Sequence, residues 1–119
     1  MTHTMRLYSE PFEQIRSGNK TIELRLNDEK RQQISVGDTI EFRETDHADK
    51  RIVTRVVALH PFPTFRQLYE TLPLLQCGYT AADIAGARPE DMDAYYSPEE
   101  QERYGVLGIA IEVIGNCQF

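Results

Sequence analysis

Cysteine and histidine are scarce in this sequence, and their positions match none of the common metal or redox motifs. The two cysteines, Cys77 and Cys117, lie far apart and form no C-x-x-C pair, so they give no zinc or redox signature. The three histidines, His3, His47 and His60, are equally scattered along the chain. We therefore expect two free thiols, no metal site and no cofactor.

Positive charge is also in short supply. The chain has 13 Lys and Arg residues against 19 Asp and Glu residues, which gives a formal net charge of -6 and a pI of about 5.0. Non-specific binding to nucleic acid draws its strength from many contacts between cations and phosphates, so this balance argues against a protein that coats nucleic acid. A local basic pocket is still compatible with the sequence, because several cations lie in the N-terminal third: Arg16, Lys20, Arg25, Lys30 and Arg31.

Long apolar runs are missing too. The stretch from Val106 to Ile111 is among the longest, and it is far shorter than the roughly 20 residues that a membrane helix needs. Residues 1–6 have no apolar core of the kind that a signal peptide carries, so we expect a cytoplasmic protein with no membrane partner. A length of 119 residues with 40% hydrophobic content fits one domain over residues 1–119.

The N-terminal part alternates between strand and helix signals. Residues 5–8 alternate apolar and polar side chains, as a short strand does. Ser9-Glu10-Pro11 then offers an N-cap serine and an early proline, which favour helix initiation, and Gly18 offers the left-handed residue that ends many helices. From Thr21 to Leu26 strict alternation returns. This pattern predicts a half-buried strand with its aliphatic residues on one face and its charged residues on the other.

The remaining segments predict an α+β fold. Further strands are expected over residues 39–43, 51–60 and 106–114, and the β-branched residues of the second place it centrally in the sheet. Short helices are expected between the last two strands, over residues 64–72, 80–84, 89–95 and 97–105. This order has too few crossover helices for a parallel α/β sheet. We expect a small mixed β-barrel with one short helix after the first strand and several helices inserted before the last strand.

The segment from Gly18 to Arg25 carries the most chemistry, because it places Lys20, Glu23 and Arg25 where a helix meets a strand. Glu23 and Arg25 are two residues apart on the strand and share a face, and Lys20 can swing toward that face. The two cations can donate hydrogen bonds to a base carbonyl or a phosphate, while Glu23 accepts from an amino group. The same spacing also fits a solvated strand face, whose ion pair would stabilise the fold by at most about 1 kcal/mol.

Five short motifs occur in a fixed order along the chain: Glu10-Pro11-Phe12, Gly18-x-Lys20-x-x-Glu23-x-Arg25, Val36-Gly37-Asp38, Tyr95-Tyr96-Ser97 and Tyr104-Gly105-Val106. Over nearly its whole length the chain thereby resembles the ASCH family, named for activating signal cointegrator homology, and looks like a small bacterial-type member of it. The resemblance implies a PUA-like barrel with a cleft beside the first helix. It also implies that the cleft binds RNA or a nucleotide-like ligand, with Lys20, Glu23 and Arg25 on its floor and Tyr96 nearby.

An enzymatic alternative stays open. One branch of ASCH-like proteins hydrolyses the acetyl amide of N4-acetylcytidine with a lysine, a threonine nucleophile three residues later and a glutamate from elsewhere in the fold. Lys20 matches the lysine, but Glu23 occupies the position of the threonine. An amidohydrolase would then need Glu23 as a general base for water, with Lys20 polarising the carbonyl and Arg25 holding the oxyanion. A third alternative, a protein-interaction domain, requires side chains to fill the cleft.

Overall fold

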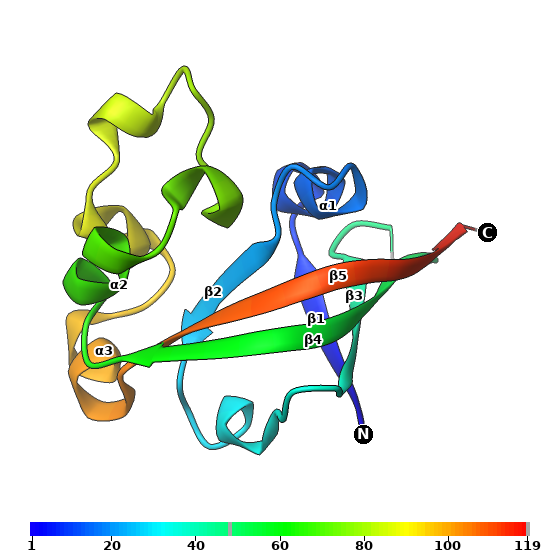
Figure 1. The fold of residues 1–119 in the computed structure, drawn as a ribbon, viewed down its shortest axis with the longest axis horizontal. Coiled ribbons are helices and arrows are strands. Elements are labelled where there is room, and N and C mark those ends of the chain that lie inside the picture. Colours follow the sequence, from blue (N-terminus) through cyan, green and yellow to red (C-terminus); the bar gives the residue numbers. More distant parts are fainter. Residues whose placement is uncertain (48, 119) are drawn as a thin grey trace.

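Five strands form one mixed sheet in the structure, which is a computed structural model (Figure 1). It describes the backbone of residues 1–47 and 49–118 and the side chains of residues 1–47 and 49–115. The strands are β1 Thr2–Leu7, β2 Ile22–Leu26, β3 Thr39–Glu44, β4 Lys50–Phe62 and β5 Val106–Gln118. Their order is β1-β3-β4-β5-β2, with β1 parallel to β3 and the other neighbours antiparallel. The prediction of a central strand over residues 51–60 is confirmed by the position of β4.

The helices lie at three places along the chain. Helix α1, Ser9–Arg16, follows β1, and the short 3-10 helix η1, Arg31–Gln33, lies in the loop after β2. The other helices lie between β4 and β5: α2 Phe65–Thr71, η2 Leu74–Cys77, η3 Ile84–Gly86, η4 Pro89–Ala94 and α3 Pro98–Tyr104. We call residues 63–105 the helical insert. Figure 1 shows β2 between α1 and this insert. Within the described residues, no helix has the length and apolar character that crossing a bilayer requires.

Two helix starts that the sequence predicts are confirmed by their hydrogen bonds. The Thr64 side chain accepts from the Gln67 backbone N–H at 3.2 Å and caps α2. The Ser97 hydroxyl oxygen accepts from the Glu100 backbone N–H at 3.2 Å, and Glu100 reaches back to form the capping box of α3. Gly105 ends α3 with a φ of +71°, a conformation that glycine adopts without strain.

Three local expectations are wrong. Ser9 is not the N-cap of α1, because Tyr8 holds that position and the Ser9 hydroxyl instead donates to the Glu44 carboxylate at 2.8 Å. The helical turn expected over residues 80–84 lies further along, at η3. The strand β2 is not half-buried, since Glu23, on its charged face, is only 4% exposed. The first error arises because the distant Glu44 takes the Ser9 hydroxyl as its donor, and the third because Glu23 is buried with its partners Lys20 and Arg25.

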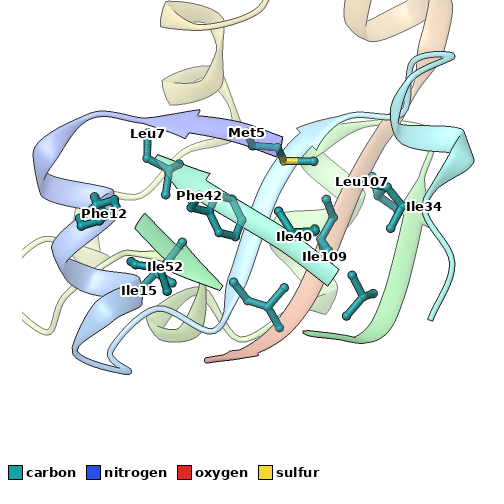
Figure 2. Close-up of a cluster of buried hydrophobic side chains, with 12 residues drawn as sticks. Met5, Leu7, Phe12, Ile15, Ile34, Ile40, Phe42, Ile52, Leu107 and Ile109 are labelled. Carbon is teal, nitrogen blue, oxygen red and sulfur yellow. The ribbon is translucent and has the colours of Figure 1, made fainter. Parts of the chain in front are cut away.

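The first hydrophobic core fills the space between α1 and the curled sheet (Figure 2). Phe12 and Ile15, which the sequence places three residues apart on one helix face, are both buried here. They pack against apolar side chains of the strands, among them Leu7 of β1 and Phe42 of β3. Because fully burying each large apolar side chain is worth about 1.5–3 kcal/mol, this core fixes α1 firmly on β1 and β3.

A second core joins the helical insert to β2. The aliphatic side chains of Ile22, Leu24 and Leu26 are buried against Phe65 and Leu68 of α2. The alternation predicted for this strand is therefore correct for its aliphatic face. Docking of the insert on that face also places the segment from Tyr69 to Tyr96 beside the charged residues of β2.

The strands β1 and β2 are the two edges of the sheet, and in the described part of the chain no backbone ladder joins them. A side chain instead spans the gap between these two edge strands, which we call the seam. The Arg25 guanidinium on β2 donates through Nη2 to the carbonyl oxygen of Arg6 on β1 at 2.9 Å. This bond gives an edge carbonyl of β1 a partner and holds Arg25 at the seam.

Candidate functional site

The turn between α1 and β2 positions Lys20. Gly18 adopts a φ of +86°, which reverses the chain after the helix, and the Lys20 backbone N–H donates to the Gln14 carbonyl at 2.9 Å. From the other side, the Thr21 N–H donates to the carbonyl of Gln76 in η2, also at 2.9 Å. Gly78 then passes so close that a Cβ there would lie 3.3 Å from the Lys20 Cδ. The Lys20 stem is thus held between α1 and the insert.

Glu23 binds both cations. Its Oε1 lies 2.8 Å from the Lys20 Nζ, and its Oε2 lies 2.9 Å from the Arg25 Nη2 and accepts from the Arg25 Nε at 3.0 Å. The side chains of Lys20, Glu23 and Arg25 are only 10%, 5% and 15% exposed. The structure therefore brings the three residues predicted from the sequence together as one buried cluster, and it excludes the solvated strand face.

The charge state of Glu23 is set by these partners. Burial raises the pKa of a carboxyl group, but here the Lys20 ammonium and the Arg25 guanidinium outweigh burial and lower the pKa of Glu23 to about 2. The carboxylate is therefore ionised across the physiological pH range. With two cations and one anion, the cluster carries a net charge of +1.

Donor hydrogens remain on both cations. Lys has three N–H groups and Arg has five. Lys20 uses one of them on Glu23, and Arg25 uses those of Nε and Nη2 on Glu23 and Arg6. Among the described residues no further acceptor is recorded for the Lys20 Nζ or the Arg25 Nη1. The cluster can therefore donate hydrogen bonds to an incoming oxygen while Glu23 keeps the cations in place.

A cavity of about 610 Å³ opens over the cluster. Lys20, Glu23 and Arg25 all line it, so the three side chains converge on a shared hollow. One wall comes from β1 and α1 and includes Arg6, Tyr8, Glu10 and Gln14; the opposite wall comes from the helical insert and includes Tyr69, Tyr79, Asp83, Asp91, Tyr95 and Tyr96. Side chains do not fill the hollow, which argues against the protein-interaction alternative. Its volume is within the range of about 300–1,000 Å³ that is usual for small-ligand sites.

Tyr96, which the family resemblance places near the ligand, lines this cavity and also packs against a neighbouring ring. Its ring is stacked on Phe65, with centroids 6.3 Å apart and ring planes 17° apart. Its neighbour Tyr95 also lines the cavity and is 65% exposed. Tyr96 is thus a fixed wall, whereas Tyr95 presents an exposed ring at the rim.

The same wall carries a hydrogen-bonded chain of side chains that no sequence pattern predicted. The hydroxyl groups of Tyr69 and Tyr79 lie 2.8 Å apart, and the Tyr79 hydroxyl donates to the Asp91 Oδ2 at 2.8 Å. The helical periodicity of residues 65–72 indicated only a packing role for Tyr69, and nothing local to Tyr79 or Asp91 marked them. Because the three come from α2, the loop after η2 and η4, only the folded insert brings them together.

Cys77 also lines the cavity as a buried free thiol. Burial raises the pKa of Cys77 to about 11 and outweighs the opposing effect of Lys20, so the thiol is protonated and a weak nucleophile. The prediction of a free thiol at Cys77 is confirmed, while the side chain of Cys117 lies outside the described residues. No group of three His, Cys, Asp or Glu side chains arranged to hold a metal ion occurs in the part of the chain that the structure describes.

Comparisons with known proteins agree with this architecture. The crystal structure of hypothetical protein PH0355 is 30% identical, with a TM-score of 0.79 over 96% of this chain and 100% of that one. The solution structure of PF0455 from Pyrococcus furiosus is 32% identical, with a TM-score of 0.73 over 96% of this chain and 98% of that one. A search of the curated proteins found no match.

A more distant likeness concerns the fold alone. A mutant of the ASCH protein of Zymomonas mobilis is 13% identical and superposes with a TM-score of 0.67, covering 98% of this chain and 73% of that one. The α+β, PUA-like fold with its curled five-stranded sheet is therefore confirmed. The profile of the ASCH domain matches residues 5–115. The chain belongs to the ASCH domain family.

Proposed function

We propose that the chain binds a nucleotide unit, either free or within single-stranded RNA, in the cavity above Glu23. The observation that carries this proposal is the combination of a cationic floor and aromatic walls in one hollow. Lys20 and Arg25 donate to phosphate or carbonyl oxygens, while Glu23 holds both in position. The +1 charge of the cluster suits an anion even though the whole chain carries -6. A cytoplasmic location, expected from the sequence, suits this class of ligand.

The aromatic residues support a base as the other half of the ligand. Stacking of a base on an aromatic side chain contributes about 1–3 kcal/mol and tolerates every base, because each has a π face. Tyr95 is exposed at the rim of the cavity and has a free ring to offer, while Tyr96 is held by Phe65. A base between these walls would leave its phosphate toward the Lys20 and Arg25 cluster.

Replacing Lys20 by Ala is expected to weaken binding of cytidine 5′-monophosphate by about tenfold to a hundredfold, the usual range for losing one hydrogen bond to a charged group. The variant should remain folded, because Glu23 keeps its bonds to Arg25. Titration calorimetry on wild type and variant measures the difference directly.

The matched control is Arg55→Ala, which removes one positive charge from an exposed ion pair with Glu112 on the sheet. It should bind the nucleotide like the wild type. A short single-stranded RNA tests the larger ligand, since each phosphate contact contributes a slope of about -0.7 to the dependence of log affinity on log salt. Equal affinity of wild type and Lys20→Ala, or no binding of either ligand by the wild type, would reject the proposal.

The amidohydrolase alternative uses the same cavity but needs Glu23 as a base. A general base works best with a pKa near the working pH, whereas the pKa of Glu23 is lowered to about 2. Both cations also occupy its oxygens. We therefore expect no release of acetate from N4-acetylcytidine. Turnover by the wild type that is lost in both Lys20→Ala and Glu23→Gln would instead support catalysis by this cluster.

A further inference from the structure

The hydroxyl groups of Tyr69 and Tyr79 have a fixed direction. Asp91 is the last member of the Tyr69–Tyr79–Asp91 hydrogen-bonded chain, and an ionised carboxylate only accepts hydrogen bonds. The pKa of Asp91 is lowered, first by the hydrogen bond from the Tyr79 hydroxyl and then by the backbone N–H of Arg88, so this carboxylate is ionised. The single hydroxyl hydrogen of Tyr79 points to the Asp91 Oδ2 at 2.8 Å. The contact of 2.8 Å between the two tyrosines must then use the hydrogen of Tyr69.

The Tyr69–Tyr79–Asp91 part of this wall consequently presents only acceptors to the cavity. Both hydroxyl hydrogens are used within the chain, which leaves lone pairs on the oxygens of Tyr69 and Tyr79 and the second oxygen of Asp91. The direction is well held. The Arg88 N–H also donates to the Asp91 Oδ2 at 3.1 Å and ties Asp91 to the start of η4, and burial raises the pKa of Tyr79, so its hydrogen stays in place.

The floor has the opposite character, because Lys20 and Arg25 only donate. All five side chains line the same cavity. A ligand that satisfies both surfaces must offer acceptors or negative charge on one side and N–H donors on the other. Nucleotides differ in this respect: cytosine and adenine carry an exocyclic amino group, whereas uracil and hypoxanthine carry a carbonyl oxygen at the same position.

We propose that the Tyr69–Tyr79–Asp91 chain selects a nucleotide whose base carries an exocyclic amino group and rejects the carbonyl analogue. This inference rests on the proposed function and names its ligand class. A carbonyl oxygen placed against the wall would meet lone pairs and lose its own hydrogen bond with water. Sites that hydrogen-bond one substrate group discriminate strongly against an analogue that leaves the polar groups of the site without partners.

The Tyr69–Tyr79–Asp91 hydrogen-bonded chain also has a structural role, which must be separated from its proposed role in selecting the ligand. It connects α2, the loop after η2 and η4, so it stabilises the insert whatever the ligand is. A purely structural role predicts that breaking the chain lowers stability and leaves the preference between ligands unchanged. The ratio of two affinities measured on the same variant is therefore the decisive quantity, since partial unfolding reduces both affinities equally.

The test compares two matched pairs by titration calorimetry: cytidine with uridine 5′-monophosphate, and adenosine with inosine 5′-monophosphate. In each pair the amino member should bind the wild type at least about tenfold more tightly. Equal affinities within both pairs would overturn the inference while leaving the proposed function intact. Absence of binding for all four nucleotides would overturn the inference, and absence of binding for the single-stranded RNA as well would overturn the proposed function.

Two variants then test whether the preference for the amino member of each pair comes from the Tyr69–Tyr79–Asp91 hydrogen-bonded chain. Tyr79→Phe separates Tyr69 from Asp91 and frees the Tyr69 hydroxyl to donate, so the preference within each pair should fall to within about twofold. The control, Tyr104→Phe, removes a tyrosine hydroxyl from a residue that packs in the second core, and it should keep the preference of the wild type. An unchanged preference in Tyr79→Phe would overturn the assignment.

Discussion

The Glu23→Gln variant is expected to unfold with a free energy about 3–5 kcal/mol lower than that of the wild type at neutral pH. Glu23 is 4% exposed and is the counterion of both Lys20 and Arg25. The amide has nearly the shape of the carboxylate but no charge, so two cations would stay desolvated beside each other. The Leu24 N–H and both cations contact the two carboxylate oxygens of Glu23. In the variant one of these oxygens becomes an NH₂ group, which is itself a donor and would face donors.

Urea unfolding followed by circular dichroism measures this difference. The matched control is Glu112→Gln, since Glu112 is also paired with an arginine, Arg55, but both side chains are about half exposed, at 47% and 54%. That exposed pair should contribute no more than about 1 kcal/mol. Similar losses in the two variants would contradict this prediction, because they would mean that burial adds nothing to the pairing of Glu23 with Lys20 and Arg25.

The sequence predicts the identity of this cluster but not its burial. Strict alternation from Thr21 to Leu26 correctly places Glu23 and Arg25 on one face of β2. Alternation of polar and apolar residues normally indicates that the polar face is open to water. Here the helical insert packs on the aliphatic face and also forms one wall of the cavity beside the charged residues. Its contacts join segments about 50 residues apart in sequence, such as Thr21 with Gln76. No local pattern contains that information.

The same limit explains the other errors. Ser9-Glu10-Pro11 fits an N-cap pattern, yet the buried carboxylate of Glu44 on β3 takes the hydroxyl of Ser9 as its donor. Tyr69 obeys the helical periodicity of its segment, but its hydroxyl is fixed by Tyr79, ten residues away. In each case a polar side chain is satisfied by a partner that the strand and helix periodicities do not reveal. Order and type of the elements were predictable because they depend on those periodicities.

The Lys20, Glu23 and Arg25 cluster places charges at the gap between β1 and β2, where apolar side chains could also pack. A buried ion pair gives little net stability compared with well-packed apolar residues of similar volume. Apolar side chains could therefore seal the gap between β1 and β2, although the Arg6 carbonyl would lose its bond to Arg25. The three charges instead line a cavity and leave donor hydrogens on Lys20 and Arg25. This arrangement suits the proposed binding site, because the donors would be fixed before a ligand arrives.

Acid should destabilise the protein through the same carboxylate. The pKa of Glu23 is 4.5 when unperturbed and is lowered to about 2 in the fold, so below pH 4.5 the unfolded chain binds the proton more readily. This contribution to stability is fully present above pH 4.5 and is lost as the pH falls through about 2. Its size is on the order of 3 kcal/mol. Urea unfolding of the wild type at a series of pH values between these limits should show the decline.

Asp38 shares this pH window and has to be separated from Glu23. Hydrogen bonds from His3 and from the Ser35 backbone lower the pKa of Asp38 to about 2 as well. The variant Asp38→Asn should therefore still lose unfolding free energy in acid through Glu23. The variant Glu23→Gln should show only the loss that comes from Asp38. Carbon-13 NMR of the wild type follows the Glu23 carboxyl directly and should give a midpoint near 2. A midpoint near the ordinary 4.5 would show that Lys20 and Arg25 do not hold this carboxylate in its charged form.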